Sequence, residues 1–112
     1  MKNYLNESLS AQERAEALVN EMTVEEAASQ LRYDAPAVER LGIPAYNWWG
    51  EGLHGVARAG TATMFPQAIA MAAMFDVELT EDIANVVSTE GRAKYNQFCE
   101  EGDRDIYKGL TF

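Results

Sequence analysis

The chain has 112 residues, enough for at most one small domain with a modest hydrophobic core. Hydrophobic residues make up 47% of it and charged residues 24%, which is the composition of an ordinary soluble globular protein and excludes a disordered chain. Nine basic residues against eighteen acidic ones give a formal charge of −9, which argues against nucleic acid or an anionic membrane surface as a partner.

No segment of the sequence is typical of export or of a membrane span. No apolar run approaches the length that crosses a bilayer, and residues 1–7 lack the apolar stretch of a signal peptide. The sequence therefore predicts a cytoplasmic protein. Cys99 stands alone, which excludes a disulfide within the chain and argues against a thiolate zinc site, so we expect a buried or simply tolerated thiol.

Two capping boxes predict two helices in the first third of the chain. Ser10 is followed three residues later by Glu13, and Thr23 in the same way by Glu26. In this pattern each side chain satisfies a backbone amide of the other residue. Apolar residues at helical spacing follow each box: Ala11, Ala15, Leu18, Val19 and Met22, then Val24, Ala27, Ala28 and Leu31. We therefore expect two helices with a bend near Thr23.

Beyond residue 33 the helical pattern breaks, and residues 43–48 are a candidate strand. Pro44 restricts it to a strand start or an edge. Glycines at positions 50, 52, 55 and 60 then predict a shaped loop in which backbone can approach a ligand closely. The loop matches neither the dinucleotide-binding nor the phosphate-binding glycine motif, which disfavours a phosphate site.

The second half predicts a short helix, a long helix and the beginning of a strand. Pro66 can open the short helix, and residues 67–74 are small and apolar all round, so we expect that helix to be buried. Asp76 is a candidate N-cap for a helix that reaches about Phe98. Residues 109–112 are expected to open a strand.

Residues 46–57 combine both tryptophans, the single histidine, a carboxylate and three glycines. Two indoles beside an acid and glycines are a poor composition for a core. They suit a sugar pocket, where flat apolar sugar faces meet aromatic rings and carboxylates bind pairs of hydroxyls.

Four blocks of sequence carry a family resemblance: residues 41–49, Glu51 with residues 53–57, residues 65–69 and residues 90–96. In this order and at these distances they resemble the start of the catalytic domain of glycoside hydrolase family 3, closest to its β-xylosidase and β-glucosidase branch. Residues 22–26 with Gln30 and Leu31 also resemble the family's lead-in. Gly52 stands where the family often has alanine.

The resemblance implies an α/β fold, a helix-rich N-terminal fragment of a (β/α)8 TIM-like barrel, for which about 250 residues are typical. Residues 1–112 would be one partial domain, with lead-in helices over residues 1–35 and the first βα segment of the barrel over residues 41–112. The rest of the barrel and a C-terminal domain would be partners of this part.

The implied activity is retaining hydrolysis of β-linked xylosides or glucosides from the non-reducing end, without a cofactor or metal. Such hydrolysis needs two carboxyl groups. In this family both come later in the barrel, so no catalytic residue is assigned in these 112 residues, and the isolated chain is expected to be inactive. Glu51 matches the family carboxylate that holds hydroxyls of the non-reducing-end sugar, and Trp49 would line the same subsite.

Three further residues are candidates for supporting roles. Trp48 and Trp49 lie in the expected strand and should point to opposite faces, so we expect Trp48 to be structural. His54 is expected to fix the loop through backbone hydrogen bonds, because no Ser or Cys nucleophile motif accompanies it. Arg58 could face a buried acid or be solvated.

Two other functions are compatible with the sequence. One is a non-catalytic carbohydrate-binding module that uses both tryptophans as a platform. The other is a small helical protein that self-associates through exposed apolar surface.

Overall fold

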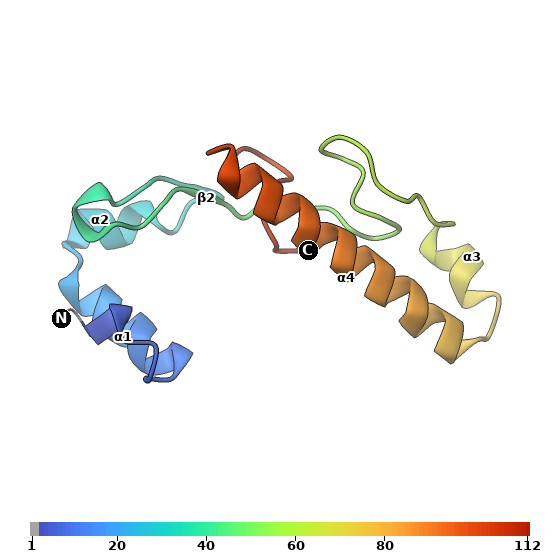
Figure 1. The fold of residues 1–112 in the computed structure, drawn as a ribbon, viewed down its shortest axis with the longest axis horizontal. Helices are drawn as coiled ribbons and strands as arrows, with labels where there is room; N and C mark the ends of the chain where they lie inside the picture. The colour runs from blue at the N-terminus through green and yellow to red at the C-terminus, as the bar shows by residue number, and fades with distance from the viewer. Residues whose placement is uncertain (1–2) are drawn as a thin grey trace. The chain divides into compact units, whose positions relative to one another are not determined.

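The computed structural model describes residues 3–112 and divides the chain into two compact units, Met1–Ala45 and Tyr46–Phe112 (Figure 1). The first unit contains η1 (Asn3–Leu5), α1 (Ala11–Glu21), α2 (Val24–Ser29), β1 (Asp34–Ala35) and η2 (Glu39–Leu41). The second contains β2 (Tyr46–Asn47), α3 (Ala68–Ala72) and α4 (Val77–Glu100). The helix-rich character is as expected; that these elements belong to a (β/α)8 barrel stays a prediction.

Both predicted capping boxes are confirmed. The Ser10 hydroxyl accepts from the amide of Glu13, whose carboxylate accepts from the Ser10 amide at 2.9 Å. Thr23 and Glu26 repeat the arrangement, again with 2.9 Å between the Thr23 amide and the Glu26 carboxylate. Met22, the C-cap of α1, and Thr23, the N-cap of α2, are both extended, which ends α1 and redirects the chain into α2. The bend expected near Thr23 is therefore present.

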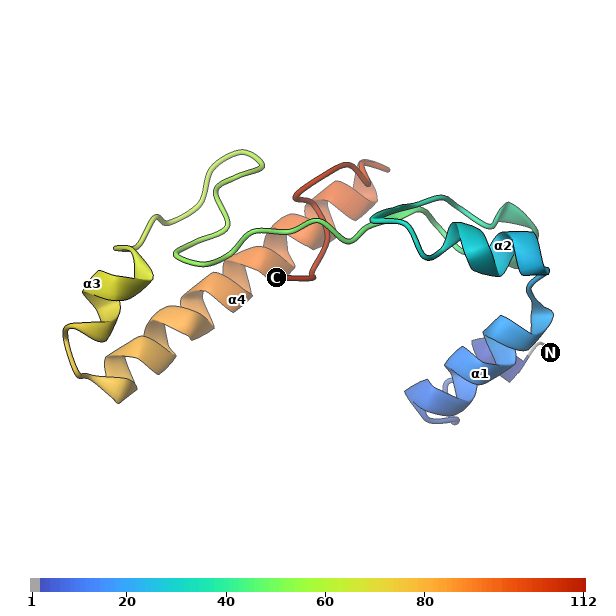
Figure 2. The same ribbon diagram turned by 180° about the vertical axis from the view of Figure 1, so that it is seen from behind.

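A small core closes the first unit. Tyr4, Val38 and Leu41 are buried together, and the Tyr4 hydroxyl donates to the Leu41 carbonyl at 2.9 Å. Partly buried residues pack around them: Ala17, Leu18, Met22 and Ile43. η1 lies against α1 (Figure 2), so apolar residues of α1 share this core with the first residues of the chain. The predicted α1 stripe is correct in part: Leu18 and Met22 pack against this core, whereas Ala11, Ala15 and Val19 are exposed.

Acid should weaken this unit. Hydrogen bonds from Ser10 lower the pKa of the Glu13 carboxyl, and hydrogen bonds from Arg40 and then from the Thr23 amide lower the pKa of Glu26. A carboxyl whose folded pKa lies below its ordinary value of about 4.5 stabilises the fold above that pH. We expect this stabilisation to fall as pH drops through about 4.5 toward the lowered folded values.

This loss of stability can be measured by urea unfolding at stepwise lower pH, followed through the NMR amide signals of α1 and α2. The double variant Glu13→Gln, Glu26→Gln removes both carboxyls and should respond much less to acid. An unchanged pH response in that variant would show that other groups are responsible.

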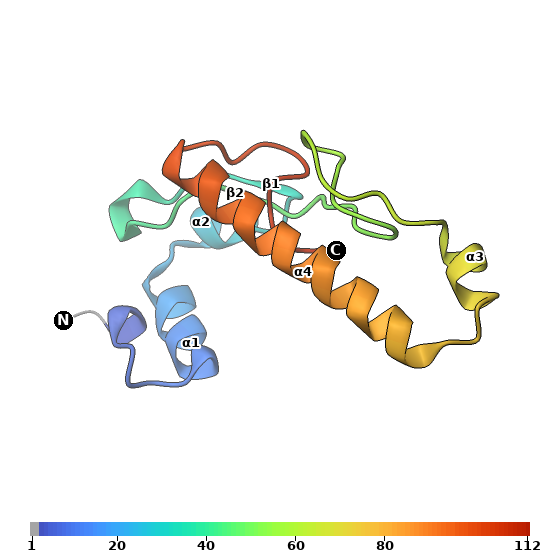
Figure 3. The ribbon, with the colours of Figure 1, turned by 45° about the vertical axis from the view of Figure 1, so that its right-hand side comes forward.

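In the second unit, α4 begins and continues as predicted. The Asp76 side chain caps it by accepting from the Leu79 amide at 2.9 Å, and the helix runs unbroken to Glu100, two residues past the expected end. Figure 3 shows the loop between β2 and α3 lying along this helix. Among the residues described, no helix is both long and apolar enough to span a membrane.

The prediction of a buried helix over residues 67–74 is wrong. α3 is shorter, Gln67 is its N-cap, and Pro66 precedes it without entering its first turn. Its Ile69 side chain is 79% exposed. A helix that is apolar all round needs neighbours on several sides. Within residues 3–112, Met71 and Ala72 line hollows that α3 shares with α4, whereas Ile69 lines neither of them.

Two strand predictions are also corrected. The strand expected over residues 43–48 is confined to Tyr46 and Asn47, so Trp48 and Trp49 follow it. Residues 109–112 form no strand, because the Tyr46 hydroxyl, and not a strand backbone, accepts the Leu110 amide at 2.7 Å. The tail nevertheless lies close to the residues after β2: a Cβ on Gly50 would lie 1.9 Å from the Thr111 carbonyl oxygen.

Candidate functional site

The backbone of Trp49 is fixed on both sides just after β2. Its amide donates to the side-chain oxygen of buried Asn47 at 2.9 Å, and its carbonyl accepts from the Tyr107 amide at 2.9 Å. Trp49 as a whole is 54% exposed. Residue 49 is therefore rigidly placed while much of its ring stays accessible, as an apolar wall of a binding site requires.

Trp48 was expected to pack into the interior, but it does not. The residue is 52% exposed, about as accessible as Trp49, because neither residue lies in a strand that would force their side chains to opposite faces. Trp48 does pack edge-on against Tyr46, with ring centroids 4.9 Å apart and an interplanar angle of 67°. This contact ties Trp48 to the strand residue beside the tail.

Glu51 and Arg58 face one another across the loop. The Arg58 Nε lies 3.7 Å from the Glu51 carboxylate, and its guanidinium lies 5.3 Å from the centre of the Tyr107 ring. Contact with Tyr107, and then the charge of Glu51, raises the pKa of Arg58. Both side chains are about half-exposed (49% for Glu51, 59% for Arg58), so water screens the pair and the carboxylate remains open to a ligand.

His54 fixes the loop as predicted. Its Nδ1 lies 2.9 Å from the Phe65 carbonyl oxygen, which makes Nδ1 the protonated nitrogen, and the Phe65 amide donates to the His54 carbonyl at 2.8 Å. Gly55 follows with a φ of 132°, and a Cβ there would lie 2.2 Å from the Thr63 carbonyl oxygen. The two sides of the loop therefore meet at a position where glycine is required.

Sequence reasoning missed two residues of α4 that hold this loop. The Lys94 ammonium donates to the carbonyls of Val56 and Thr61, and the Glu90 carboxylate accepts from the amide and hydroxyl of Thr63. Burial lowers the pKa of Lys94, and the negative charge of Glu90 opposes that shift. The available signal was their spacing of four residues, which places both on one helix face.

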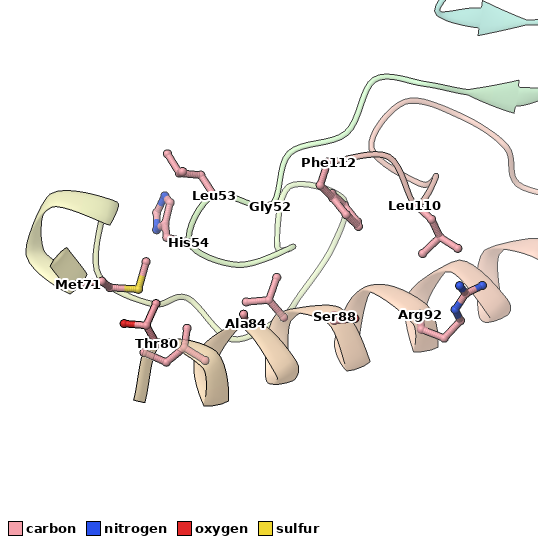
Figure 4. A pocket seen from close by; sticks show the side chains of 12 residues that line it. Gly52, Leu53, His54, Met71, Thr80, Ala84, Ser88, Arg92, Leu110 and Phe112 are labelled. Carbon is pink, nitrogen blue, oxygen red and sulfur yellow. The ribbon is translucent and has the colours of Figure 1, made fainter. Parts of the chain in front are cut away.

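An apolar hollow of about 450 Å³ lies between the loop, α4 and the tail, apart from Glu51 and Trp49. In Figure 4, Leu110 and Phe112 point toward α4. Other apolar lining residues are Leu53, Met71, Ile83 and Val87. Glu51, the residue expected to bind sugar, does not line this hollow, so we do not assign the hollow to the sugar.

Comparisons with known proteins give close matches over most of the chain, although no protein-family model matches it. A probable exo-1,4-β-xylosidase of Aspergillus fumigatus is 50% identical over 97 residues, which cover 77% of this chain and 13% of that protein. A xylan 1,4-β-xylosidase of Xylanibacter ruminicola is 45% identical over 93 residues, covering 83% of the chain and 11% of that protein.

The chain is a homologue of the β-xylosidases of glycoside hydrolase family 3. The resemblance seen in the four sequence blocks is thereby confirmed. The homologous enzymes are hydrolases that act on glycosides, as their names state. The chain spans only 11% to 13% of the length of these relatives.

Proposed function

We propose that this chain is the N-terminal part of the catalytic barrel of a retaining β-glycosidase. The homologous proteins are named as β-xylosidases, which favours β-linked xylosides over glucosides as substrates of the whole enzyme. The catalytic carboxyl groups would come from elsewhere in the barrel, because no acid of this chain matches either one in the family. The chain's own share would be part of the subsite for the non-reducing-end sugar.

The observation that carries this proposal is the pairing of Trp49 and Glu51 on one loop directly after β2. The Trp49 peptide is held from both sides, and its exposed ring offers an apolar surface for a sugar face. Glu51, two residues on, presents a half-exposed carboxylate. An ionised carboxylate can accept short, charge-assisted hydrogen bonds from two hydroxyls.

The purified chain is expected to be catalytically silent. Retaining hydrolysis needs a nucleophile and an acid/base about 5–5.5 Å apart, and Glu51 faces Arg58 and not a second carboxylate. Incubation with 4-nitrophenyl β-xyloside and 4-nitrophenyl β-glucoside, followed by absorbance, tests this. Release of nitrophenol above the rate in buffer, in step with the amount of chain added, would contradict the proposal.

A second candidate function, self-association, is favoured by apolar side chains on and around α3. Ile69, Phe75 and Val77 are largely exposed. Exposed apolar side chains that gather into a patch mark association sites. Gel filtration over a range of concentrations separates the candidates, since a subsite fragment without self-association elutes as a monomer throughout.

A further inference from the structure

The Lys94 ammonium binds two carbonyl groups of the site loop, the segment of residues 48–67 between β2 and α3. Its Nζ lies 2.8 Å from the carbonyl oxygen of Val56 and 3.3 Å from that of Thr61. The two carbonyls are five residues apart in the chain and converge on one cation. An ammonium has three donors and no acceptor, so it can hold both carbonyls at once. Residues 56–61 are thereby drawn onto α4.

Glu90 anchors the same loop two residues further on. Its carboxylate accepts from the Thr63 hydroxyl at 2.7 Å and from the Thr63 amide at 3.1 Å. Glu90 and Lys94 lie one turn apart on α4, so the two anchors act from one helix face. Their opposite charges also compensate each other beside a partly buried stretch of backbone.

The loop needs these anchors because no helix or strand is assigned to residues 48–67. Hydrogen bonds between His54 and Phe65 close the base of this loop. Arg58 lies between these two residues in the sequence, in a part of the loop that their hydrogen bonds do not hold. The contact between Arg58 and Glu51 joins two half-exposed side chains at 3.7 Å. An ion pair of this kind contributes little by itself, so it does not hold the loop in place.

We propose that Glu90 and Lys94 are positioning residues for the sugar subsite: by fixing residues 56–63 on α4 they place the Arg58 guanidinium opposite the Glu51 carboxylate. In the sequence, Arg58 lies between Val56 and Thr61, whose carbonyls Lys94 binds. The loop therefore presents Arg58 in one orientation, over the Tyr107 ring. The Arg58 charge then directs which carboxylate oxygen of Glu51 is free for a hydroxyl. This role rests on the function proposed for Glu51.

The test compares backbone and side-chain mobility by NMR in the 112-residue chain and in Lys94→Met, Lys94→Arg and Glu90→Gln variants. Lys94→Met keeps the apolar stem and removes the donor, Lys94→Arg keeps a cationic donor, and Glu90→Gln removes the charge while keeping one acceptor. Arg92→Met is the matched control: it removes a positive charge from the same helix at a residue whose guanidinium lies over the Tyr95 ring.

In Lys94→Met we expect order parameters of residues 57–62 to fall from about 0.85 to below about 0.6, with exchange broadening or loss of the Arg58 Nε–H signal. Lys94→Arg should restore both, Glu90→Gln should lie between them, and Arg92→Met should match the parent chain. Unchanged order of residues 57–62 in Lys94→Met, with α4 intact, would overturn the proposal. If Lys94→Met loses its helical circular dichroism, unchanged mobility in Glu90→Gln overturns it instead.

Titration with methyl β-xyloside separates this proposal from the function of the site. If the loop becomes mobile in Lys94→Met but the parent chain binds no xyloside, the anchors hold the loop and the proposed sugar subsite is wrong. If the parent chain binds xyloside and a mobile loop in Lys94→Met leaves that binding unchanged, the subsite stands and the positioning role is overturned.

Discussion

Gly50→Ala is expected to release the C-terminal tail and to destabilise the second unit by about 3 kcal/mol, the upper part of the range for overpacking. A Cβ at this position would lie 1.9 Å from the Thr111 carbonyl oxygen and 3.1 Å from its carbonyl carbon. These are backbone atoms that cannot rotate aside, so the tail itself has to move. Urea unfolding and the amide signals of Leu110 and Thr111 measure the loss.

Gly52→Ala is the matched control for this prediction. The nearest atoms to its added Cβ belong to the Phe112 ring, at 3.1 and 3.3 Å, and a side-chain ring can shift by a few tenths of an ångström. We expect a much smaller change in stability, with the tail still in place. Equal effects of the two substitutions would show that the Thr111 contact does not hold the tail.

Glu51→Gln is expected to weaken binding of methyl β-xyloside at least about tenfold. A hydrogen bond to a charged group contributes about 1.5–3 kcal/mol, and a tenfold change in affinity corresponds to about 1.4 kcal/mol. Glutamine keeps the size of the side chain but loses the charge and one acceptor. NMR titration of the chain and the variant gives the two dissociation constants.

The exposed acid Glu25 supplies the control for charge alone. It lies in the first turn of α2, in the unit that does not contain the site loop. Glu25→Gln removes one negative charge and should leave the dissociation constant unchanged. Equal weakening by both variants would show that net charge, and not the Glu51 carboxylate, controls binding.

The features that were predicted correctly from the sequence depend on interactions between residues only a few positions apart. Capping boxes need only a Ser or Thr and a Glu three positions later, and both formed as expected. The Asp76 cap belongs to the same class. The role of His54 in fixing the loop was also predictable, because a lone histidine without a nucleophile has few other uses in a glycine-rich loop.

The features that sequence predicted poorly depend on groups far along the chain. Burial of α3 was inferred from its composition, but composition states what a helix requires and not what surrounds it. The opposed faces of Trp48 and Trp49 assumed a strand longer than the two residues that form. The partners of Lys94 lie more than thirty residues away, and no local pattern names them.

The arrangement at the site favours a subsite wall over a tryptophan platform. A carbohydrate-binding module would use both indoles as one stacking surface. Trp48 instead meets Tyr46 edge-on, while Trp49 is adjacent in sequence to Gly50 and Glu51 and has its backbone fixed. We therefore expect sugar contact to be concentrated at Trp49 and Glu51.

One NMR titration of the chain with methyl β-xyloside tests the proposed sugar subsite, because a single series of spectra reports both binding and cleavage. We expect saturable shifts of the Trp49 indole N–H and the Glu51 amide, much smaller shifts at the Trp48 indole, and no free xylose or methanol. Absence of any shift at Trp49 and Glu51, or hydrolysis of the xyloside by the chain, would contradict it.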